Sequence, residues 1–438
     1  MKEKIGIIQH GCSKNLIDTE LMAGILLENG YEITLDWEAP DVKSVIINTC
    51  SFVHDAEKES VQSILCAIAL EKRVIVVGCL PQKHKDDLKK AIPEIEAMIG
   101  TTDFGEIIAA LGGEDKISEN PCYVYPEEVK RAQITVGASS YIKIADGCDF
   151  ACSYCIIPKL RGKYRSRKPE DIIKEAKMLA DKGVAEIILI AQDTTSYGKD
   201  LKDPGGDTNL AKLLSELNKI ENLNWIRVLY TYPTGFDDEL IDAFASLNKV
   251  VKYIDMPLQY SHSEVLAQMK RPKIDYEKLI SKIRAKIPNV ALRTTFITGY
   301  PTETGEQFAH LKNFIKKVKF DRLGVFEFSR EKGTYADTLR PQIPAKVKRA
   351  RKNELLSIQK EISNELNKRL VGKKIPCIIE EVHSDGTAIA RSFRDAPEID
   401  GLVYLKLKNH VNPCDIVEAK ITHHKDYDLF GETDGSVV

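Results

Sequence analysis

Apolar positions in the first part of the chain form short runs separated by amphipathic stretches. Runs typical of buried strands occur at Ile5–Ile8, Ser44–Asn48 and Arg73–Val77. A helical pattern lies between the first two, from about Leu16 to Glu28. Because strands and helices alternate, we predict a parallel sheet covered by helices. This N-terminal α/β domain is expected to span residues 1–115.

The middle of the chain repeats the same alternation six times. Strand patterns separated by helical patterns occur at Tyr141–Ala145, Glu186–Ala191, Trp225–Tyr230, Val251–Met256, Ala291–Thr298 and Leu323–Phe328. Six strand–helix units predict an incomplete parallel barrel, and right-handed crossovers would place every strand's carboxyl end on one face. This partial (β/α)6 barrel is expected to span residues 134–366, after a connector at about Gly105–Gly137.

The last part of the chain follows a different pattern. A long amphipathic helix is predicted from Ala345 to Leu370, because its apolar residues recur at three- and four-residue spacing. Short strand patterns with Gly, Asp and Asn between them follow at Ile375–Glu380, Thr387–Arg391, Leu402–Leu407 and Ile416–Thr422. Their spacing predicts a small antiparallel β-barrel over residues 369–436. The predicted fold class is therefore α/β with a C-terminal β-barrel.

Composition indicates a globular protein with little net charge. The 438 residues include 63 basic and 65 acidic ones, a net charge of −2, which argues against a chain that mainly neutralises nucleic-acid phosphates. The start shows no signal-peptide pattern and no apolar run reaches membrane-spanning length. We therefore expect a cytoplasmic protein without a membrane partner. Its ten cysteines should then be ligands or core residues rather than disulfides.

Three cysteines lie within eight residues of the middle part. Cys148, Cys152 and Cys155 have the spacing C-x3-C-x2-C. Thiolates this close together favour a soft metal centre, and three ligands would leave one iron of an iron–sulfur cluster open. The alternatives are a structural zinc loop or three unconnected thiols. Zinc normally takes a fourth Cys or His, however, and no His lies between Cys148 and Gly162.

A second set of three cysteines lies in the N-terminal part. Cys12, Cys50 and Cys79 each stand just beyond a predicted strand. Because the carboxyl ends of parallel strands share one edge of a sheet, these thiols can converge there. The arrangement predicts a second iron–sulfur cluster. Cys66 is expected in the core and Cys122 to be structural or incidental, and neither Cys377 nor Cys414 has ligand spacing.

Polar residues recur near the predicted carboxyl ends of the barrel strands, where active sites of such folds lie. The candidates for cofactor binding are Gln192, Asp193, Gln259, Arg293 and Gly299. A basic run, Lys159–Lys168, follows the cysteine loop, and six of its ten residues are Lys or Arg. It is either a solvated loop or a surface for an anionic substrate or an acidic redox donor.

The order of the two cysteine sets and the final domain resembles the methylthiotransferase family of radical S-adenosylmethionine enzymes, over essentially the whole chain. The stretches that carry the resemblance are Gly11–Asn15, Asn48–Cys50, Gly78–Leu80, Asp146–Cys148, Ala191–Gly198 and Ala396–Gly401. The stretch Gln192–Gly198 is more similar to the branch that modifies a ribosomal protein than to the tRNA-modifying branch. Gln259-Tyr260-Ser261 departs from the family, which more often shows Gln-His or a nearby Ser-Gly.

The resemblance implies two 4Fe-4S clusters and S-adenosyl-L-methionine as cofactors. Cys148, Cys152 and Cys155 would hold the cluster that cleaves S-adenosylmethionine to a 5′-deoxyadenosyl radical. The auxiliary cluster, whose open iron carries the transferred sulfur, would be held by Cys12, Cys50 and Cys79. The implied substrate is the β-carbon of an aspartate in the small-subunit ribosomal protein S-twelve, free or on the ribosome. An electron donor and a sulfur donor are the other implied partners.

The final domain resembles a TRAM domain, an OB-like barrel that binds RNA in tRNA-modifying relatives. Residues 372–438 carry eight Lys or Arg and twelve Asp or Glu, a difference of −4 that favours a basic protein partner over RNA. The alternative substrate is isopentenyladenosine in tRNA, which the basic run Lys159–Lys168 supports. A second alternative is an electron carrier without catalysis, although a barrel with polar strand ends is typical of an enzyme.

Overall fold

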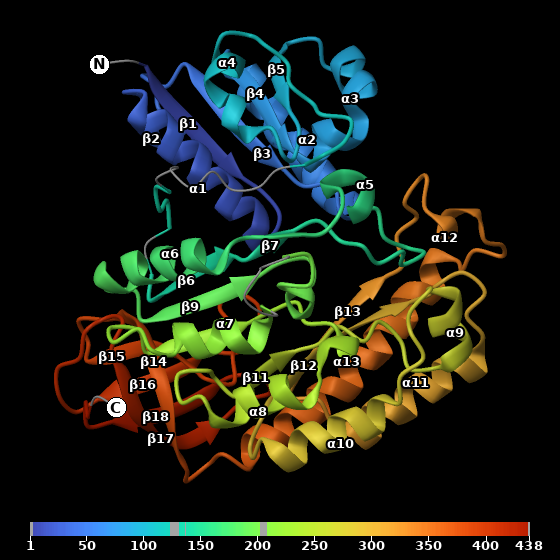
Figure 1. Ribbon diagram of the computed structural model, residues 1–438. Helices are drawn as coiled ribbons and strands as arrows, with labels where there is room; N and C mark the ends of the chain where they lie inside the picture. Colours follow the sequence, from blue (N-terminus) through green and yellow to red (C-terminus); the bar gives the residue numbers. More distant parts are fainter. Residues whose placement is uncertain (1–2, 123–130, 136, 202–207, 437–438) are drawn as a thin grey trace.

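The computed structural model describes residues 3–122, 131–135, 137–201 and 208–436, so residues 123–130 and 136 of the predicted connector lie outside the described residues. Figure 1 shows three parts: an α/β domain at the top, a half-open barrel of strands and helices below it, and a small β-barrel at the lower left. The predicted fold class is confirmed.

The N-terminal domain is a five-stranded parallel sheet with the order β2-β1-β3-β4-β5. Its strands are β1 (Lys4–Gln9), β2 (Glu32–Thr34), β3 (Ser44–Thr49), β4 (Arg73–Gly78) and β5 (Ile95–Ile99). Its helices are α1 (Ser13–Glu28), α2 (His54–Ala69), α3 (Cys79–Ala91), η1 (Phe104–Glu106) and α4 (Ile107–Leu111). The three predicted strands are confirmed, whereas β2 and β5 were not predicted.

Successive residues of the central strands pack on opposite faces of this sheet. Ile46 and Ile75 belong to a core with α1 and α4, whereas Val45 and Val74 belong to a core with α2 and α3. Because helices cover both faces, the strands are continuous apolar runs rather than alternating ones.

The middle part is an open arc of six parallel strands. Sheets β10-β9-β6 and β11-β12-β13 are joined by a bridge between Ile226 and Val250. The strands are β6 (Ser139–Lys143), β9 (Glu186–Ile190), β10 (Trp225–Val228), β11 (Tyr253–Asp255), β12 (Ala291–Thr298) and β13 (Arg322–Glu327). The six predicted strands are therefore confirmed within a few residues at their ends.

Helices cover the outer face of this arc. They are α6 (Pro169–Asp181), α7 (Leu210–Leu217), α8 (Asp238–Ser246), α9 (Ser263–Gln268), α10 (Tyr276–Lys286) and α11 (Gly305–Val318), whereas α12 (Tyr335–Thr338) lies against the cysteine loop, where the Ala336 amide donates to the Ser153 carbonyl. Shorter elements, most of them near the carboxyl ends of the strands, are β7 (Ala145–Asp146), α5 (Ile157–Arg161), β8 (Arg165–Ser166), η2 (Thr194–Ser196) and η3 (Pro233–Gly235).

The long helix α13 (Ala345–Lys368) joins the arc to the third domain. Leu355 and Ile362 on its apolar stripe are buried in the core of the arc. Five strands then close a barrel in the order β14-β15-β16-β18-β17. They are β14 (Lys374–Val382), β15 (Thr387–Ser392), β16 (Val403–Leu407), β17 (Ile416–His424) and β18 (Leu429–Thr433). Four of its strand pairs are antiparallel, but β16 and β18 are parallel, and β18 was not predicted.

Ion pairs hold the third domain against the arc, near the amino ends of the strands. Glu186 of β9 accepts hydrogen bonds from Arg227 of β10 and Arg391 of β15, and all three side chains are buried. Arg322 of β13 pairs in the same way with Asp395. The third domain therefore closes the arc from below, and the carboxyl ends of the strands remain on the side of the N-terminal domain (Figure 1).

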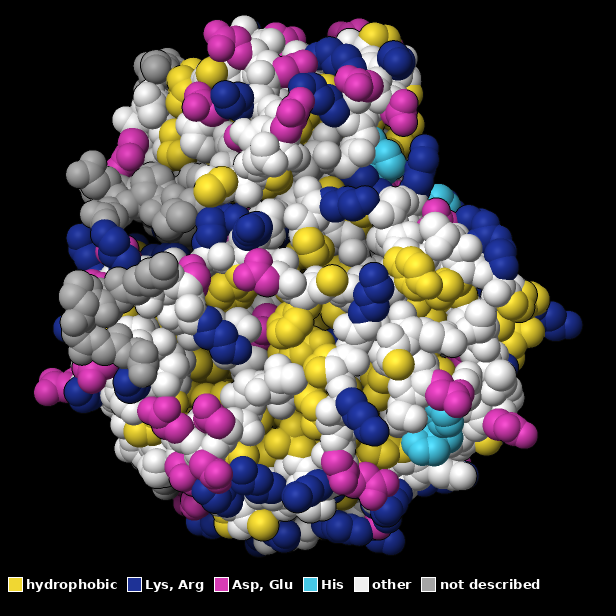
Figure 2. Space-filling model, turned by 45° about the vertical axis from the view of Figure 1, so that its right-hand side comes forward, with side chains coloured by type: hydrophobic (Ala, Val, Ile, Leu, Met, Phe, Trp, Pro, Cys, Tyr) yellow, Lys and Arg dark blue, Asp and Glu magenta, His cyan; other side chains and the backbone are white. Residues whose placement is uncertain are grey.

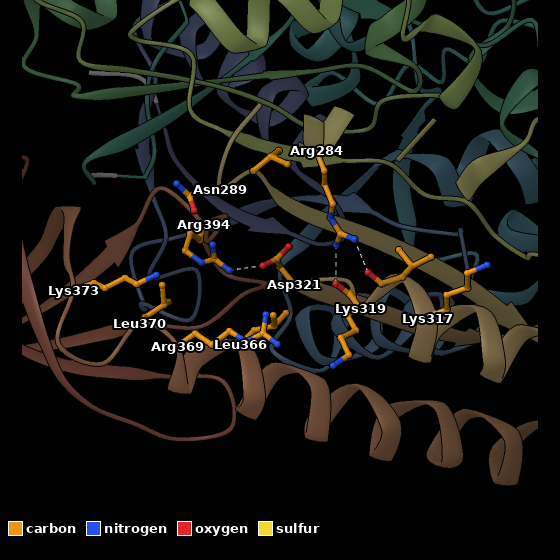
Figure 3. A pocket seen from close by; sticks show the side chains of 12 residues that line it. Arg284, Asn289, Lys317, Lys319, Asp321, Leu366, Arg369, Leu370, Lys373 and Arg394 are labelled. Atoms are coloured by element: carbon orange, nitrogen blue, oxygen red, sulfur yellow. Dashed lines mark hydrogen bonds and ion pairs between the residues drawn. The ribbon is translucent and has the colours of Figure 1, made fainter. Parts of the chain in front are cut away.

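Apolar and charged side chains gather in different regions of the surface. Figure 2 shows apolar side chains gathered in the middle of one face and charged side chains toward its edges. A basic cavity of about 350 Å³ lies where α11, α13 and the third domain meet, and the pair Asp321–Arg394 and Arg284 line it (Figure 3). No cysteine lines this cavity. Among the described residues, no helix combines the length and apolarity that crossing a membrane requires.

Candidate active site

The first cysteine triad, Cys148, Cys152 and Cys155, lies in the loop between β7 and α5. The amide of Cys148 donates to the carbonyl of Gly162 at 3.1 Å, and that of Cys155 donates to the carbonyl of Cys152 at 3.0 Å. Ser153 in the same loop lies 2.8 Å from the Tyr300 hydroxyl, measured between the oxygens. The loop is therefore fixed against the mouth of the arc.

Burial and the neighbouring thiols disfavour ionisation of Cys148 and Cys155 in the absence of a positive centre. Burial, and then the neighbouring Cys152, raise the pKa of Cys148 to about 11. Burial, Cys152 and Cys148 raise the pKa of Cys155 to about 12. The three sulfurs thus lie close enough to influence one another, and a cationic metal centre would favour their thiolate forms.

The second triad comes from three successive strand ends of the N-terminal sheet. Cys12 precedes α1, Cys50 directly follows β3, and Cys79 begins α3 directly after β4. Burial, together with Cys50 and Cys12, raises the pKa of Cys79 to about 12, so the three thiols lie close enough to influence one another. The side chain of Cys12 is exposed, and although partial desolvation opposes ionisation, the charges of Lys14 and Arg161 lower its pKa.

Replacing Gly11 by alanine should disrupt the second triad. Gly11 has φ +91°, and an added Cβ would lie 2.8 Å from the Cβ of Cys50. We expect this variant to lose about four irons per chain after anaerobic reconstitution, measured by iron analysis. Gly30→Ala is the matched control, because Gly30 has φ +80° and nothing within 4 Å of its added Cβ. Equal iron content in the two variants would contradict the expectation.

The short helix α5 lies at the lower end of the N-terminal domain, between that domain and the arc (Figure 1). Cys79 of the second triad packs in one cluster with Ile156 and Leu160. Ile156 directly follows Cys155 of the first triad. Two groups bound at the two triads would therefore be separated by little more than this segment.

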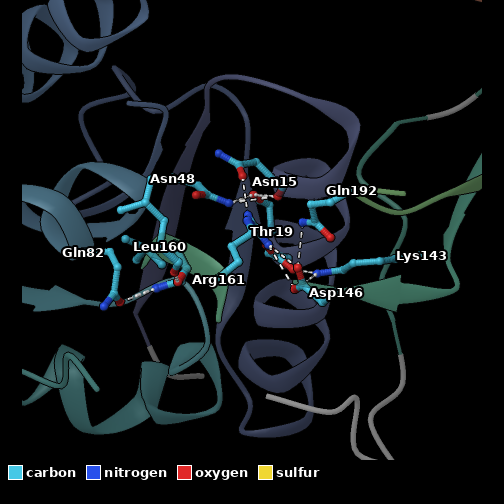
Figure 4. Close-up of polar contacts among 12 residues, drawn as sticks. Asn15, Thr19, Asn48, Gln82, Lys143, Asp146, Leu160, Arg161 and Gln192 are labelled. Carbon is cyan, nitrogen blue, oxygen red and sulfur yellow. Dashed lines mark hydrogen bonds and ion pairs between the residues drawn. The ribbon is translucent and has the colours of Figure 1, made fainter. Parts of the chain in front are cut away.

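A buried polar network fixes the position of α5 (Figure 4). Arg161, at the end of α5, pairs with Asp18 of α1 and Asp146 of β7, each at 3.1 Å. Lys143 of β6 pairs with the same two carboxylates. Although burial opposes it, Lys143 and Arg161 hold the pKa of Asp146 well below its usual range. Two basic and two acidic groups balance one another, and they join the N-terminal domain to the arc.

Gln192 and Asp193 stand at the mouth, as predicted from the sequence. Gln192 donates to Asp146 at 2.7 Å, and its buried Oε1 has no hydrogen-bond partner among the described residues. The carboxylate of Asp193 accepts hydrogen bonds from Thr195 and Ser196, so it shapes the turn η2. The carbonyl oxygen of Asp193 accepts a hydrogen bond from Tyr164 at 2.9 Å.

Gln259 and Gly299 also lie beyond strand ends. Gln259 continues the pairing of β11 with β12. Its amide donates to the carbonyl of Thr295, and its carbonyl accepts from the amide of Ile297, both at 2.8 Å. The amide of Gly299, directly after β12, donates to Glu303 at 2.6 Å. That amide is therefore already used within the turn.

Arg293 lies elsewhere, and its predicted place at the mouth is wrong. It is the third residue of β12, in the half of the strand nearer the third domain. Its guanidinium is 2.7 Å from Asp255 and 3.6 Å from Asp400, a residue of the third domain. The sequence pattern locates the strand. It does not show whether a charged residue on that strand lies near the mouth or near the opposite end.

The basic run Lys159–Lys168 is not simply a solvated loop. Arg161 and Arg167 are buried and paired, Arg167 with Glu175 at 2.6 Å. These two arginines are therefore structural and do not face an anionic substrate. Cys66 is another correction, because it lies exposed on the outer face of α2 rather than in the core.

Aromatic residues around the first triad were missed by the sequence analysis. Phe150 stacks on Tyr232, with ring centroids 4.0 Å apart, and the guanidinium carbon of Arg271 lies 4.2 Å from the Tyr232 centroid. A cavity of about 290 Å³ beside the triad is lined by Cys148, Asp149, Phe150, Tyr164, Asp193, Ser196, Lys199 and Asp200. Phe150 lies inside the cysteine spacing, which is the one signal that pointed to it.

Among the described residues, no group of three or more His, Cys, Asp or Glu side chains is arranged to hold one metal ion. Neither triad thus has the closed ligand set of the structural zinc site considered above.

Three family descriptions match successive parts of the chain. Residues 4–100 match the uncharacterized protein family UPF0004, residues 142–315 match the radical SAM superfamily, and residues 371–433 match the TRAM domain. Each match lies within one of the predicted domain ranges, whose boundaries stay predictions. The radical SAM match implies a 4Fe-4S cluster and S-adenosylmethionine.

Among solved structures, the fold is similar to the radical S-adenosylmethionine methyltransferase TsrM from Kitasatospora setae. The TM-score is 0.55 at 14% identity, over 76% of each chain. The cobalamin-dependent S-adenosylmethionine radical enzyme OxsB gives a TM-score of 0.50 at 12% identity, over 82% of this chain and 56% of OxsB. At such identities the likeness shows the fold alone.

Curated relatives are similar over almost the whole chain. The "Ribosomal protein uS12 methylthiotransferase RimO" of Thermoanaerobacter sp. (strain X514) is 46% identical, over 98% of this chain and 100% of its own. The protein of the same name from Aquifex aeolicus (strain VF5) is 43% identical, over 98% and 96%. The chain therefore belongs to the RimO family of methylthiotransferases, which are radical S-adenosylmethionine enzymes.

Proposed function

We propose that this chain attaches a methylthio group to the β-carbon of an aspartate in ribosomal protein uS12, using two 4Fe-4S clusters. One observation carries the proposal: Cys79 of the second triad packs against Ile156 and Leu160, which follow the first triad in the chain. Relatives of this name are 41–47% identical over nearly the full chain.

Each triad is given a separate task in this proposal. Cys148, Cys152 and Cys155 would hold the cluster at the mouth, and Cys12, Cys50 and Cys79 the auxiliary one. When bound, the clusters supply the electron that cleaves S-adenosylmethionine and the sulfur that is transferred. An external reductant and a sulfur donor complete the proposal.

The chain's own residues would bind and orient S-adenosylmethionine beside the first triad. The cavity of about 290 Å³ there is bounded by Phe150 and Tyr164, which can cover an apolar part of the cofactor. Gln192 offers a buried, unpartnered amide oxygen to a hydroxyl or ammonium donor of the cofactor. Asp193 is committed to its own turn, so we assign it the role of shaping the cavity.

Product analysis by mass spectrometry tests this function. Anaerobically reconstituted enzyme would receive S-adenosylmethionine, reductant and sulfide, with either a peptide of the uS12 aspartate loop or bulk tRNA. We expect a methylthio group on the aspartate of the peptide and none on tRNA. A methylthio group on a tRNA adenosine alone would move the chain to the alternative substrate. Failure to cleave S-adenosylmethionine would favour the electron carrier.

A further inference from the structure

Lys14 is a buried lysine that faces the barrel mouth from the neighbouring domain. It lies at the start of α1, two residues after Cys12, and is 8% exposed. Its Nζ is 3.0 Å from the centroid of the Tyr230 ring, just beyond the carboxyl end of β10. The hydroxyl oxygens of Ser13 and Tyr230, 3.4 Å apart, join the same two elements. The ammonium group is therefore fixed between the second triad and the mouth.

In the described part of the chain, no carboxylate pairs with Lys14, and its ammonium group lies over the face of the Tyr230 ring. The nearby carboxylates already have partners: Asp18 pairs with Lys143 and Arg161, and Asp255 pairs with Arg293. A buried ammonium group without an anion is unfavourable, and an aromatic face compensates only part of its lost hydration. Apart from the Cys12 thiol, on which its charge acts, the described part of the chain provides no anion for Lys14, so a bound carboxylate would be favourable here.

We infer that Lys14 binds the carboxylate of the substrate aspartate, an inference that rests on the proposed function. The aspartate carboxylate is bonded directly to the β-carbon, so an ion pair at Lys14 would hold that carbon between the mouth and the second triad. Lys14 is placed for this because it follows Cys12 by two residues and touches Tyr230 of the arc. A tRNA adenosine has no carboxylate, so the same ion pair also selects against that substrate.

The competing role for Lys14 is to balance the negative charge of the second triad. Its charge does act on the Cys12 thiol, as described above. That role predicts an effect on iron binding and on the reduction potential of the auxiliary cluster. Recognition of the substrate instead predicts an effect that depends on the carboxylate of the peptide, so the two roles can be separated by binding measurements.

The test measures peptide binding to the reconstituted holoenzyme with S-adenosylmethionine and without reductant, so that no turnover occurs. A fluorescent uS12 loop peptide and the same peptide with asparagine in place of the aspartate are compared by anisotropy. We expect the wild type to bind the aspartate peptide about 10- to 100-fold more tightly, as for a charge-assisted contact. In Lys14→Met this preference should disappear, and Lys14→Arg should restore part of it.

Lys163→Met is the control. Lys163 is an exposed lysine two residues after the end of α5, and this variant should keep the full preference. An unchanged preference in Lys14→Met would overturn the inference. If Lys14→Met loses iron, Lys14→Gln replaces it, and an unchanged preference there would assign Lys14 to the second triad. A wild type that binds neither peptide would overturn the proposed substrate itself, and the inference with it.

Discussion

Alanine at Cys148, Cys152 and Cys155 together should abolish cleavage of S-adenosylmethionine and leave about four irons per chain. These thiols form one of two separate sites, and the second is built by Cys12, Cys50 and Cys79 on strand ends of another domain. Removing the first set leaves the second intact. The measurements are 5′-deoxyadenosine formation, iron analysis and electron paramagnetic resonance of the reduced protein.

Removal of the second triad should have a different effect. Alanine at Cys12, Cys50 and Cys79 should keep the cleavage of S-adenosylmethionine but end methylthio transfer to the peptide. Cys66→Ala is the control, since Cys66 is exposed on α2 and outside both triads. A folded variant of the first triad that holds no iron would show that the two-cluster proposal is wrong.

The second large effect is expected from Glu186→Ala, which removes the carboxylate between Arg227 and Arg391. Glu186 is 0% exposed, and both arginines donate to it. Breaking a buried pair leaves uncompensated charge, which typically costs about 3–5 kcal/mol. We expect the urea midpoint of unfolding to fall accordingly. Glu216→Ala is the control, because Glu216 and its partner Lys219 are exposed, and an exposed pair contributes about 1 kcal/mol or less.

The effect of Glu186 should also depend on pH. Burial opposes ionisation of Glu186, but Arg227 and Arg391 outweigh it and hold its pKa below the ordinary value. A carboxyl whose pKa is lowered by folding stabilises the protein fully above its unfolded pKa, about 4.3, and loses that contribution as the pH falls through the folded pKa. The difference between wild type and Glu186→Ala should therefore narrow below about pH 4. A difference that stays constant down to pH 2 would contradict this origin.

Most strands could be predicted because burial on two faces makes them continuous apolar runs, as in β3 and β4. Two of the missed strands, β2 and β18, lack such runs, whereas β5 is a short apolar segment that was passed over. β2 has only three residues, Glu32–Thr34, and β18 contains Gly431 and Glu432 in the middle of its sequence. Their pairing is decided by neighbouring strands, and the parallel pairing of β16 with β18 needs tertiary contacts that no local pattern encodes.

The site could be predicted where chemistry depends on residue type and spacing. The first triad is a single loop, and the second follows from strand ends that must share an edge. The roles of charged residues were harder to predict, because the same type of side chain can bind a ligand at the mouth or form an ion pair inside the protein. Arg293 and Arg161 both proved to be paired inside the protein, and only the packing of domains reveals Lys14 without a carboxylate.

The ion pairs between the arc and the third domain limit how this chain can be divided into modules. A version shortened after α13 would retain all six cysteines of the two triads, yet Glu186 would lose Arg391, and Arg322 would lose Asp395. The three sequence families in the chain are therefore not interchangeable building blocks. Transplanting the third domain between relatives would require exchanging its arginine and aspartate partners in the arc as well.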